Sequence, residues 1–298
     1  MDGVVAPAPI PHGPAVRGTL FYKMTGSGND FVVLDGRATT PERWTAARVR
    51  AICDRRAGVG ADGLVILTPT AAGTVRMSYW NSDGSHGAMC GNAALCSGRL
   101  AVELEMVPAG EFCLLTDAGM VRVISQGPAD EAEINLPDVA LPRDAPELER
   151  AAGEHWFSLG AVGVPHLVVR VDDIETVDVL SRGKVLRSHP ALGPMGANVN
   201  FVSRQPEKRA PWLIRTFERG VEGETLACGT GTVAAGLSLA VRGEASAPVT
   251  FRSRGGPELT VRAQLDVERA ADVWLRGEGR RLFRGVWEGE GRTRVEPP

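Results

Sequence analysis

Short segments in which hydrophobic residues alternate with polar ones, or form brief apolar runs, cover most of the chain from Thr19 onward. Segments of this kind, bounded by Gly, Pro, Asn or Asp, are typical of β-strands. In the first half of the chain, strands are predicted at residues 20–24, 30–36, 62–69, 74–81, 112–119, 120–126 and 132–137. In the second half, strands are predicted at residues 157–163, 165–173, 197–204, 213–220, 249–256, 258–266 and 272–279.

Three longer segments have a helical pattern. Residues 41–54 are predicted to form an amphipathic helix, with Thr40 as its N-cap and Pro41 at its first position. Residues 91–104 are apolar on one side, and residues 227–242 are apolar and rich in alanine, so both are predicted to be helical. Residues 136–155 are rich in proline and charge and are predicted to be a connector.

The two halves of the chain carry similar marks at nearly constant spacing. Asn29 lies 164 − 29 = 135 residues before Val164, and Asn81 lies 218 − 81 = 137 residues before Glu218. The sequences "MCGNAALCSG" and "ACGTGTVAAG" place a cysteine at an offset of 228 − 90 = 138 residues. Gly-rich turns recur by chance in α/β proteins, but a cysteine at the same offset favours a duplicated α+β unit. Two such domains facing each other would bring Cys90 and Cys228 to opposite sides of one site.

Composition limits the function classes. The chain has 298 residues, of which 43% are hydrophobic and 23% are charged, and this is enough for two globular domains. The net charge of −3 does not favour binding to nucleic acid or to an anionic membrane, and no apolar run reaches the roughly 18 residues of a membrane span. Residues 1–18 lack the pattern of a signal peptide and are predicted to be a flexible leader.

The five cysteines are Cys53, Cys90, Cys96, Cys113 and Cys228. Their number is odd and there is no Cys-x-x-Cys pair, which argues against a zinc site and a disulfide scaffold. We therefore expect a cytoplasmic protein with free thiols and no metal.

Two of these thiols precede predicted helices. A helix N-terminus offers unpaired N–H groups and a partial positive charge, which bind carboxylates and lower the pKa of a cysteine placed there. Two such sulfurs on opposite sides of one carbon can invert an amino acid at its α-carbon, because one removes a proton as thiolate and the other returns one as thiol. The residues that offer this chemistry are Cys90, Gly91 and Asn92 in the first half and Cys228, Gly229 and Thr230 in the second.

Other interpretations of these residues fit the sequence less well. Cys53, Cys96 and Cys113 are expected to be core residues. "CGTGT" lacks the Gly-Lys-Ser/Thr of a phosphate-binding P-loop. A structural disulfide between Cys90 and Cys228 does not fit a cytosolic protein. No motif for pyridoxal phosphate is present, so no cofactor is expected.

The chain resembles the diaminopimelate epimerases, which need no cofactor and act in the synthesis of lysine and peptidoglycan precursors. The resemblance extends from about Phe21 to Trp287. The motifs that carry it are "KMTGSGNDFVVLDG", "CDRRAGVGADGLVIL", "WNSDGS", "MCGN", "GVPHLVVRVDD", "NVNFV", "FERGVEGETLACGTGTVAAG" and "RGEG".

The resemblance implies the fold and the roles of the residues. It implies an α+β fold of two pseudo-symmetric domains, each a curved, mostly antiparallel sheet around a central helix, formed by residues 19–132 plus 277–298 and by residues 133–276. Cys90 and Cys228 match the two acid/base thiols, and His166 and Glu218 match residues that tune them. The residues that match substrate contacts are Asn29, Asn81, Gly91, Asn92, Asn198, Glu218, Arg219, Gly229 and Thr230. A homodimer acting on LL-diaminopimelate is implied as well.

The sequence departs from the commonest pattern of that family at a few positions. Val164 replaces an asparagine, Gly63 replaces a glutamine found in some members, and His86 and Gly87 stand where an acidic residue is more usual. Three alternatives therefore stay open: a racemase of another amino acid such as a histidine-type substrate, an isomerase of the same fold without thiol chemistry, and a non-catalytic binder of small carboxylates.

Overall fold

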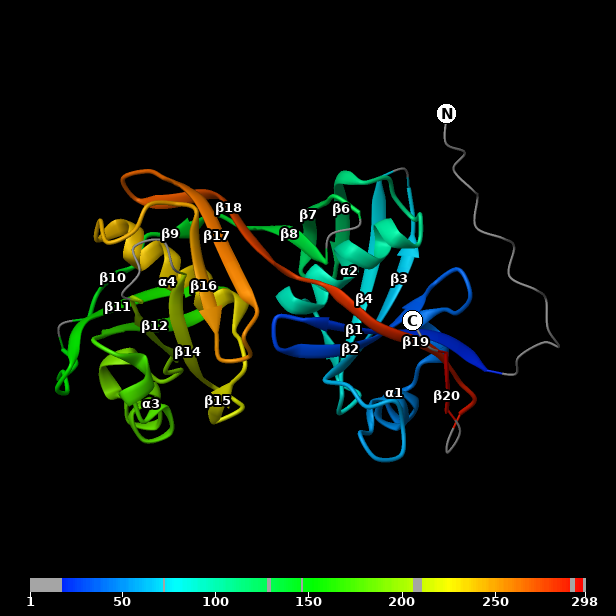
Figure 1. Ribbon diagram of the computed structural model, residues 1–298, viewed down its shortest axis with the longest axis horizontal. Helices are drawn as coiled ribbons and strands as arrows, with labels where there is room; N and C mark the ends of the chain where they lie inside the picture. The colour runs from blue at the N-terminus through cyan, green and yellow to red at the C-terminus, as the bar shows by residue number, and fades with distance from the viewer. Residues whose placement is uncertain are drawn as a thin grey trace.

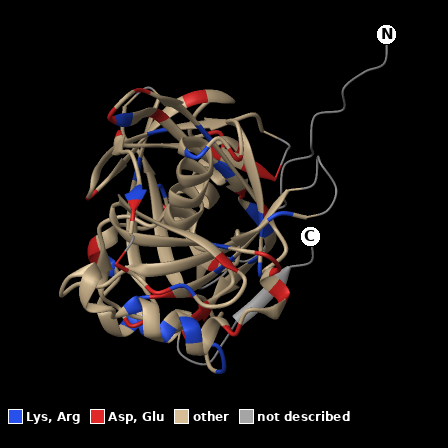
Figure 2. Ribbon diagram, turned by 90° about the vertical axis from the view of Figure 1, so that its left-hand side faces the viewer, with Lys and Arg blue, Asp and Glu red and all other residues tan. Residues whose placement is uncertain are grey.

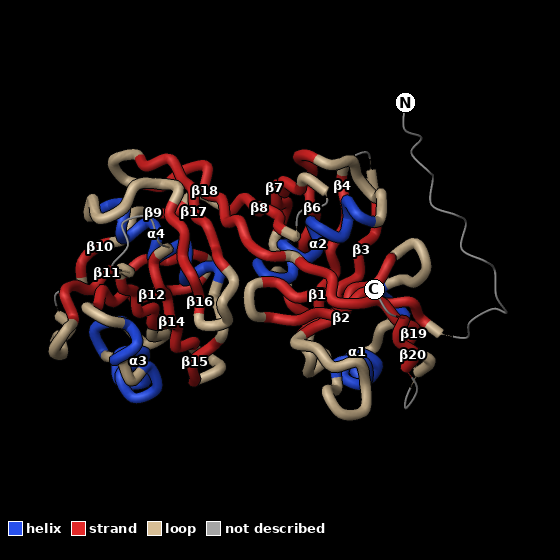
Figure 3. The backbone as a smooth tube through the Cα atoms, viewed as in Figure 1, coloured by secondary structure: helices blue, strands red, loops and turns tan. Residues whose placement is uncertain are grey.

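The computed structural model describes residues 18–71, 73–127, 130–145, 147–205, 211–289 and 293–296. The chain forms two lobes side by side, and strands surround the central helix of each lobe (Figures 1 and 3). The predicted leader, residues 1–18, lies outside the described residues except for Gly18. None of the helices in the described part of the chain has the length and hydropathy that crossing a bilayer requires.

The N-terminal lobe is a mixed sheet around helix α2 (Gly91–Glu103). Its strands are β1 (Thr19–Gly26), β2 (Asn29–Asp35), β3 (Gly63–Pro69), β4 (Thr74–Asn81), β5 (His86–Gly87), β6 (Gly110–Thr116), β7 (Gly119–Ser125) and β8 (Glu131–Leu136). The pairings β1–β2, β3–β4, β6–β7 and β7–β8 are antiparallel, whereas β2–β3 and β4–β6 are parallel. β5 pairs with the end of β4.

The C-terminal lobe repeats this plan around helix α4 (Gly229–Val241). Its principal strands are β11 (Glu154–Val162), β12 (Val164–Val171), β13 (Asn198–Ser203), β14 (Trp212–Glu218), β15 (Gly223–Thr225), β16 (Val249–Ser253), β17 (Glu258–Leu265) and β18 (Arg269–Glu278). The pairings β11–β12, β13–β14, β16–β17 and β17–β18 are antiparallel, and β12–β13 and β14–β16 are parallel. The sequence of pairings is the same as in the N-terminal lobe, as the predicted duplication requires.

The repeated marks in the sequence occupy equivalent places in the two lobes. One pair begins the second strand of each unit, another ends the fourth strand, and the cysteines precede the central helices. The pairs are Asn29 with Val164, Asn81 with Glu218, and Cys90 with Cys228.

Strand pairing and the C-terminal segment of the chain both join the lobes. The last strands of the two units, β8 and β18, pair antiparallel, with Ile134 opposite Leu275. The chain then continues into β19 (Arg280–Trp287), which pairs with β1, and β20 (Thr293–Glu296), which pairs with β19. The boundaries predicted at 132/133 and 276/277 fall within β8 and β18, and the division into two domains at these residues stays a prediction.

The central helices are buried because their sequences offer small and apolar residues on most sides. α2 packs against β8, β1 and β18, and α4 packs against β11, β12 and β17. Leu95, Leu100 and Val233 have no exposed surface, and burying each such side chain contributes about 1.5–3 kcal/mol. α4 contains no charged residue, and Figure 2 shows this uncharged helix enclosed by strands, with positive and negative residues interspersed around it.

The prediction of one continuous helix at residues 41–54 is wrong for its first turn. The structure has a 3-10 turn, η1 (Pro41–Arg43), and then α1 (Ala46–Cys53), whose N-cap is Thr45 instead of Thr40. The reason is Trp44, which is 3% exposed and donates from its indole N–H to Thr39 Oγ1 at 3.0 Å. This buried indole fixes the chain at the point where a continuous helix would pass.

The region between the lobes and the middle of the C-terminal lobe contain elements that the pattern does not predict. The predicted connector, residues 136–155, includes the short strands β9 (Val139–Ala140) and β10 (Arg143–Asp144), which pair with β18 and β11. Helix α3 (Val179–Arg187) is flanked by η2 (Ile174–Thr176) and η3 (Pro190–Leu192). α3 is capped by Asp178, whose carboxylate accepts from the Ser181 amide at 3.1 Å.

We predict that Gly26→Ala destabilises the protein by about 1–3 kcal/mol. Gly26 ends β1 where it passes the first turn of α2, and a Cβ there would lie 2.8 Å from the Asn92 carbonyl oxygen and 2.7 Å from Cys96 Sγ. The free energy of unfolding from urea titration measures the effect. Gly223→Ala is the control, because a Cβ at Gly223 meets nothing closer than 4.0 Å. Equal stability of the two variants would contradict the close approach of β1 to α2.

Candidate active site

Cys90 and Cys228 are the N-cap residues of α2 and α4, as the sequence predicts. Both have extended backbones, with φ/ψ of −138°/124° and −135°/106°, and neither side chain caps its helix. Their carbonyls accept the first helical bonds, from the amides of Ala94 and Thr232 at 2.9 Å. Both are partly buried free thiols, so each sulfur lies beside the unpaired amides of a helix start.

The two helix starts lie against each other. A Cβ at Gly229 would be 3.7 Å from the side-chain oxygen of Asn92, and one at Gly28 would be 2.9 Å from Leu226 Cβ. The turn between β1 and β2 therefore contacts the segment that precedes α4. The side-chain oxygen of Asn92 is buried and has no hydrogen-bond partner among the described residues. An unpaired acceptor at the junction of two helix starts is suited to an N–H donor of a ligand.

Burial, and not the helix N-terminus, has the larger effect on both thiols. Burial raises the pKa of Cys90, while hydrogen bonds from the backbone of Ala93 and Asn92 lower it. Burial and then the charge of Glu218 raise the pKa of Cys228 to about 11, against hydrogen bonds from Thr230 and Gly231. The helix amides do lower the pKa of each cysteine, as predicted. The net shift is nevertheless upward, so the expectation of a lowered pKa is wrong, because removal of the sulfur from water has the larger effect.

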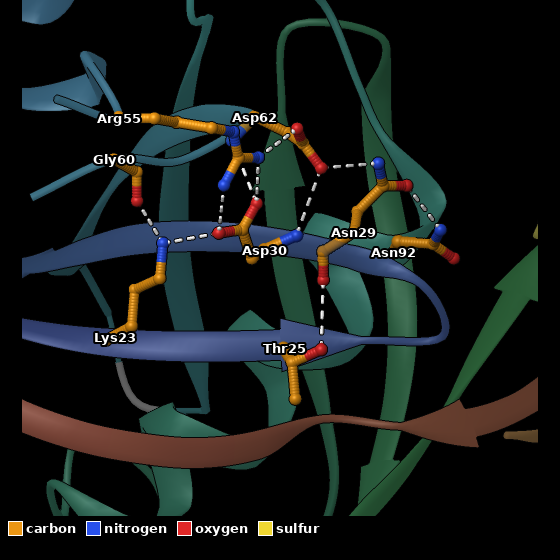
Figure 4. Close-up of polar contacts among 8 residues, drawn as sticks. All are labelled: Lys23, Thr25, Asn29, Asp30, Arg55, Gly60, Asp62 and Asn92. Atoms are coloured by element: carbon orange, nitrogen blue, oxygen red, sulfur yellow. Dashed lines mark hydrogen bonds and ion pairs between the residues drawn. The ribbon is translucent and has the colours of Figure 1, made fainter. Parts of the chain in front are cut away.

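In the N-terminal lobe, side-chain hydrogen bonds connect Asp62, through Asn29, to Asn92 in the first turn of α2 (Figure 4). Asp62 Oδ2 accepts from Asn29 Nδ2 at 2.9 Å, and Asn29 Oδ1 accepts from Asn92 Nδ2 at 2.8 Å. These two bonds orient both amides, because the carboxylate of Asp62 can only accept. Asn29 and Asn92, which the sequence predicts as substrate contacts, are thus joined directly.

Neighbouring charged side chains fix the position of Asp62 in this hydrogen-bond network. Arg55 donates to Asp30 and to Asp62 at 2.7 Å each, and Lys23 donates to Asp30 at 2.5 Å and to the carbonyl of Gly60 (Figure 4). Burial alone would raise the pKa of Asp30, but the hydrogen bonds from Arg55 and Lys23 lower it to about 2. The carboxylate is therefore charged and paired at neutral pH.

In the C-terminal lobe the buried His166 is hydrogen-bonded to Asn200, which lies beside the first turn of α4. His166 lies on β12 and has no exposed surface. Asn200 Nδ2 donates to His166 Nδ1 at 3.3 Å, and Asn200 Oδ1 accepts from Thr216 Oγ1 at 3.0 Å. A Cβ at Gly231 would lie 2.1 Å from Asn200 Oδ1 and 3.3 Å from Cys228 Sγ, so only glycine fits beside this amide.

His166 is neutral in the folded protein. Burial and then the charge of Arg219 lower its pKa to about 4. With Nδ1 as an acceptor the proton is on Nε2, which is buried and has no partner among the residues that the structure describes.

Glu218, Arg219 and Asn198 gather at the ends of β14 and β13. The Asn198 side-chain oxygen accepts from the backbone amide of Arg219 at 2.8 Å, and the Arg219 guanidinium donates to the Met195 carbonyl at 3.2 Å. Burial raises the pKa of Glu218. The charge of Glu218 raises the pKa of both Cys90 and Cys228, so this carboxyl group affects both thiols.

Asn81 ends β4 in the opposite lobe. Its side-chain oxygen accepts from the Tyr79 hydroxyl at 2.8 Å, and its amide donates to Ser85 Oγ at 3.0 Å. Val164, where the resemblance led us to note a missing asparagine, begins β12 and is partly exposed.

Sequence reasoning missed three residues that support the site: Asp62, Tyr79 and Asn200. Asp62 and Asn200 lie inside the motifs "CDRRAGVGADGLVIL" and "NVNFV", so their place in those motifs was the available signal. Tyr79 directly precedes "WNSDGS" and carried no signal of its own, because the folding of β4 against Phe31 and β5 places its ring.

A cavity of about 480 Å³ lies elsewhere in the C-terminal lobe, lined by residues that include Trp212, Glu244 and Pro248. It contains none of the predicted site residues and lies beyond the end of α4 opposite Cys228. The two cysteines and this cavity are therefore separate features.

Comparisons of the sequence with known proteins point to one family. The sequence profile described as "Diaminopimelate epimerase" matches residues 21–135 and 159–270. The chain is 43% identical over 282 residues to a diaminopimelate epimerase of Gemmatimonas aurantiaca, covering 89% of this chain and 98% of that protein.

Among solved structures, the fold is similar to a phenazine biosynthesis protein of the PhzF family from Bacillus anthracis. The TM-score is 0.67 at 13% identity, and the match covers 95% of this chain and 100% of the other. A hydroxyproline epimerase from Agrobacterium vitis matches with a TM-score of 0.62 at 18% identity, covering 94% of this chain and 93% of the other. These similarities confirm the predicted fold class of two pseudo-symmetric α+β domains.

We predict that His166 makes stability depend on pH between about 6.5 and 4. The unfolded chain binds a proton at this histidine in that window and the folded protein does not, so the free energy of unfolding falls as pH falls, by about 3 kcal/mol at most. Urea titrations at several pH values measure it, and His166→Gln should flatten the dependence by this amount. His189→Gln is the control, because its ring is partly exposed. Parallel curves for the wild type and His166→Gln would contradict a buried neutral histidine.

Proposed function

The chain belongs to the diaminopimelate epimerase family, and we propose that it converts LL-2,6-diaminopimelate to the meso isomer by a two-base thiol/thiolate mechanism without pyridoxal phosphate. The observation that carries the proposal is the pair of free thiols, Cys90 and Cys228, at two helix starts that lie against each other. The family match supports the reaction, and the geometry supports the assignment of its bases.

The α-carboxylate of the substrate binds between the two helix starts in this proposal. The residues that would hold it are Gly91, Asn92, Gly229 and Thr230, which form the first turns of α2 and α4. Backbone amides at a helix start bind an anion and stabilise the negative charge that develops when the α-proton leaves. The buried, unpaired side-chain oxygen of Asn92 would accept a hydrogen bond from the α-ammonium group.

The reaction balances with the two thiols alone. One sulfur, as thiolate, removes the α-proton, and the electron pair of the broken C–H bond is delocalised into the carboxylate. The other sulfur donates its proton to the opposite face of the same carbon and becomes the thiolate. Exchange of a proton between the thiols and water then restores the starting state. In this proposal the two sulfurs titrate as a coupled pair, because the charge of Cys90 raises the pKa of Cys228.

Burial serves this chemistry although it raises both pKa values. A thiolate in a site shielded from water is poorly solvated, and it is therefore a stronger base toward a carbon acid. His166 and Glu218 tune the thiols in our proposal: Glu218 through its charge, and His166 through Asn200, which lies beside Gly231 in the first turn of α4.

The far end of the substrate is assigned to Asn81, Asn198 and Arg219, with Asn29 nearer the reacting carbon. A guanidinium can bind a carboxylate through two parallel hydrogen bonds, and Asn198 fixes the backbone of Arg219 through its amide. These contacts would distinguish diaminopimelate, which has a second amino-acid end, from shorter amino acids.

We further propose a cytoplasmic homodimer, as the family resemblance implies. A reducing compartment is required because two neighbouring free thiols must stay reduced for acid/base work. Light scattering coupled to gel filtration measures the oligomeric state, and a monomer at micromolar concentration would contradict the dimer.

We predict that Cys90→Ser and Cys228→Ser each lower turnover of LL-diaminopimelate by about 10²- to 10⁴-fold. Serine keeps the shape of the side chain but is a far weaker acid. Proton NMR in deuterated water under reducing conditions follows loss of the α-proton signal and formation of the meso isomer. Cys113→Ser, a partly buried thiol on β6, is the control and should retain activity.

Two results would overturn parts of the proposal. Full activity in either serine variant would remove that thiol from the mechanism. If LL-diaminopimelate is inert while another amino acid exchanges its α-proton, the two-base chemistry stands and the substrate is different.

A further inference from the structure

Asn200 lies on β13 beside the first turn of α4, and its side chain has no exposed surface. Its amide nitrogen donates to the Leu167 carbonyl and to His166 Nδ1, each at 3.3 Å, and its oxygen accepts from the Thr216 hydroxyl at 3.0 Å. Because a carbonyl can only accept, the bond to Leu167 fixes which end of the amide is the nitrogen. The orientation of this buried amide is therefore determined by its partners.

The amide leaves no room for a side chain in the first turn of α4. A Cβ at Gly231, the third residue of α4, would overlap Asn200 Oδ1 and would lie 3.0 Å from Asn200 Cγ. The same Cβ would lie 3.3 Å from Cys228 Sγ, so Asn200 and the Cys228 sulfur both lie against Gly231. The Cys228 carbonyl accepts from the amide and the hydroxyl of Thr232 at 2.9 Å each. The turn that carries Cys228 is thus in contact with Asn200.

The N-terminal lobe has apolar side chains in the equivalent place. The strands β2, β3 and β4 pair in the same directions and register as β12, β13 and β14. The equivalent residues are Phe31 with His166, Val65 with Asn200, Tyr79 with Thr216, and Ala93 with Gly231. The Phe31 ring packs edge-on against the Tyr79 ring at 6.3 Å between centroids, and Ala93 carries the methyl group that Gly231 cannot carry. The fold can therefore support a central helix without a buried amide.

The polar residues of the C-terminal lobe are costly to bury unless they are hydrogen-bonded. One of them is incompletely paired. With Nδ1 accepting from Asn200, the proton of the neutral His166 ring is on Nε2, which is buried and has no partner among the described residues. Asn200 therefore contacts two features at once, the tautomer of His166 and the start of α4.

We propose that Asn200 is a positioning residue for Cys228: its amide selects the Nε2–H tautomer of His166 and holds the first turn of α4 in place against Gly231. The inference rests on the proposed function, in which Cys228 is one of two acid/base thiols. Cys90 has no such support, because Val65 and Ala93 occupy the equivalent positions. Loss of the amide therefore disturbs the helix start of the C-terminal lobe and leaves that of the N-terminal lobe unchanged.

The contact is tested with Gly231→Ala, Asn200→Ala and the double variant, using the urea midpoint of unfolding. Alanine is more favourable than glycine inside a helix, so Gly231→Ala would raise the midpoint if the contact were absent. We expect Gly231→Ala to lower the midpoint of the wild type, because the methyl group overlaps Asn200 Oδ1. We expect the same substitution to raise the midpoint of Asn200→Ala, because the overlap is gone. The sign of the effect thus reverses.

Turnover of LL-diaminopimelate is measured on the same samples, with Val202→Ala as the control. Val202 is a buried residue two positions further along β13 on the same face, and it belongs to the apolar cluster that includes Val233 of α4. We expect Asn200→Ala to lower kcat and kcat/KM together by about 10- to 100-fold, because displacing a reacting group by about 1 Å has an effect of this size. Val202→Ala should retain the kcat of the wild type.

The tautomer of His166 is measured by heteronuclear NMR of the histidine rings at neutral pH, with His166→Gln to assign the signals. We expect only the Nε2–H form in the wild type. In Asn200→Ala we expect a mixture with the Nδ1–H form, because Nδ1 has lost its donor. A role of Asn200 in packing alone would leave the tautomer unchanged.

Three results would each overturn the proposal. They are a higher urea midpoint in Gly231→Ala than in the wild type, the Nδ1–H tautomer in the wild type, and equal kcat in Asn200→Ala and Val202→Ala. The first two do not require Asn200→Ala to fold, and they need no substrate. If the wild type fails to act on LL-diaminopimelate, the proposed function is wrong, while the urea and NMR measurements still decide whether Asn200 holds His166 and the start of α4.

Discussion

The meeting of two helix N-termini, each with a cysteine at its cap, is the constraint on which the structure depends. It sets two requirements against each other. The amides of a helix start favour a thiolate, whereas enclosing the sulfur between two lobes favours the neutral thiol. In this protein burial has the larger effect on both cysteines. In the proposed mechanism the resulting thiolate is scarce at neutral pH but strongly basic, and removal of a proton from an unactivated carbon demands a strong base.

The duplicated fold satisfies this constraint with little additional machinery. Each unit places a helix inside its sheet with the N-terminus toward the other lobe, and the pairing of β8 with β18 joins the two units. Behind each helix start a polar chain fixes the side chains: Asp62 and Asn29 lead to Asn92 in one lobe, and Thr216 and Asn200 lead to His166 in the other. The two halves therefore share a backbone plan but differ in the chemistry of their support. One is backed by charged pairs, the other by neutral buried groups.

Much of the fold could be predicted from the sequence, because strand periodicity and the spacing of repeated marks are local properties of the chain. The cysteines at two helix starts were predictable for the same reason. Details that depend on contacts between distant residues could not be predicted. The burial of Trp44 interrupts the helix predicted at residues 41–54. Helix α3 was missed because its apolar pattern is weak. The sequence around Gly87 likewise does not show that the Tyr79 ring packs against this glycine. The predicted direction of the cysteine pKa shifts was wrong, because a short sequence motif does not show how deeply its residues are buried.

The central claim is that the Cys90 and Cys228 sulfurs face one shared space, and a short thiol-specific crosslinker tests it most directly. Dibromobimane, which bridges two thiols only when they are close, is added to the reduced protein, and the products are mapped by mass spectrometry. The account predicts a Cys90–Cys228 crosslink that LL-diaminopimelate suppresses and that Cys113 does not share. Separate modification of Cys90 and Cys228 without any bridge would contradict it.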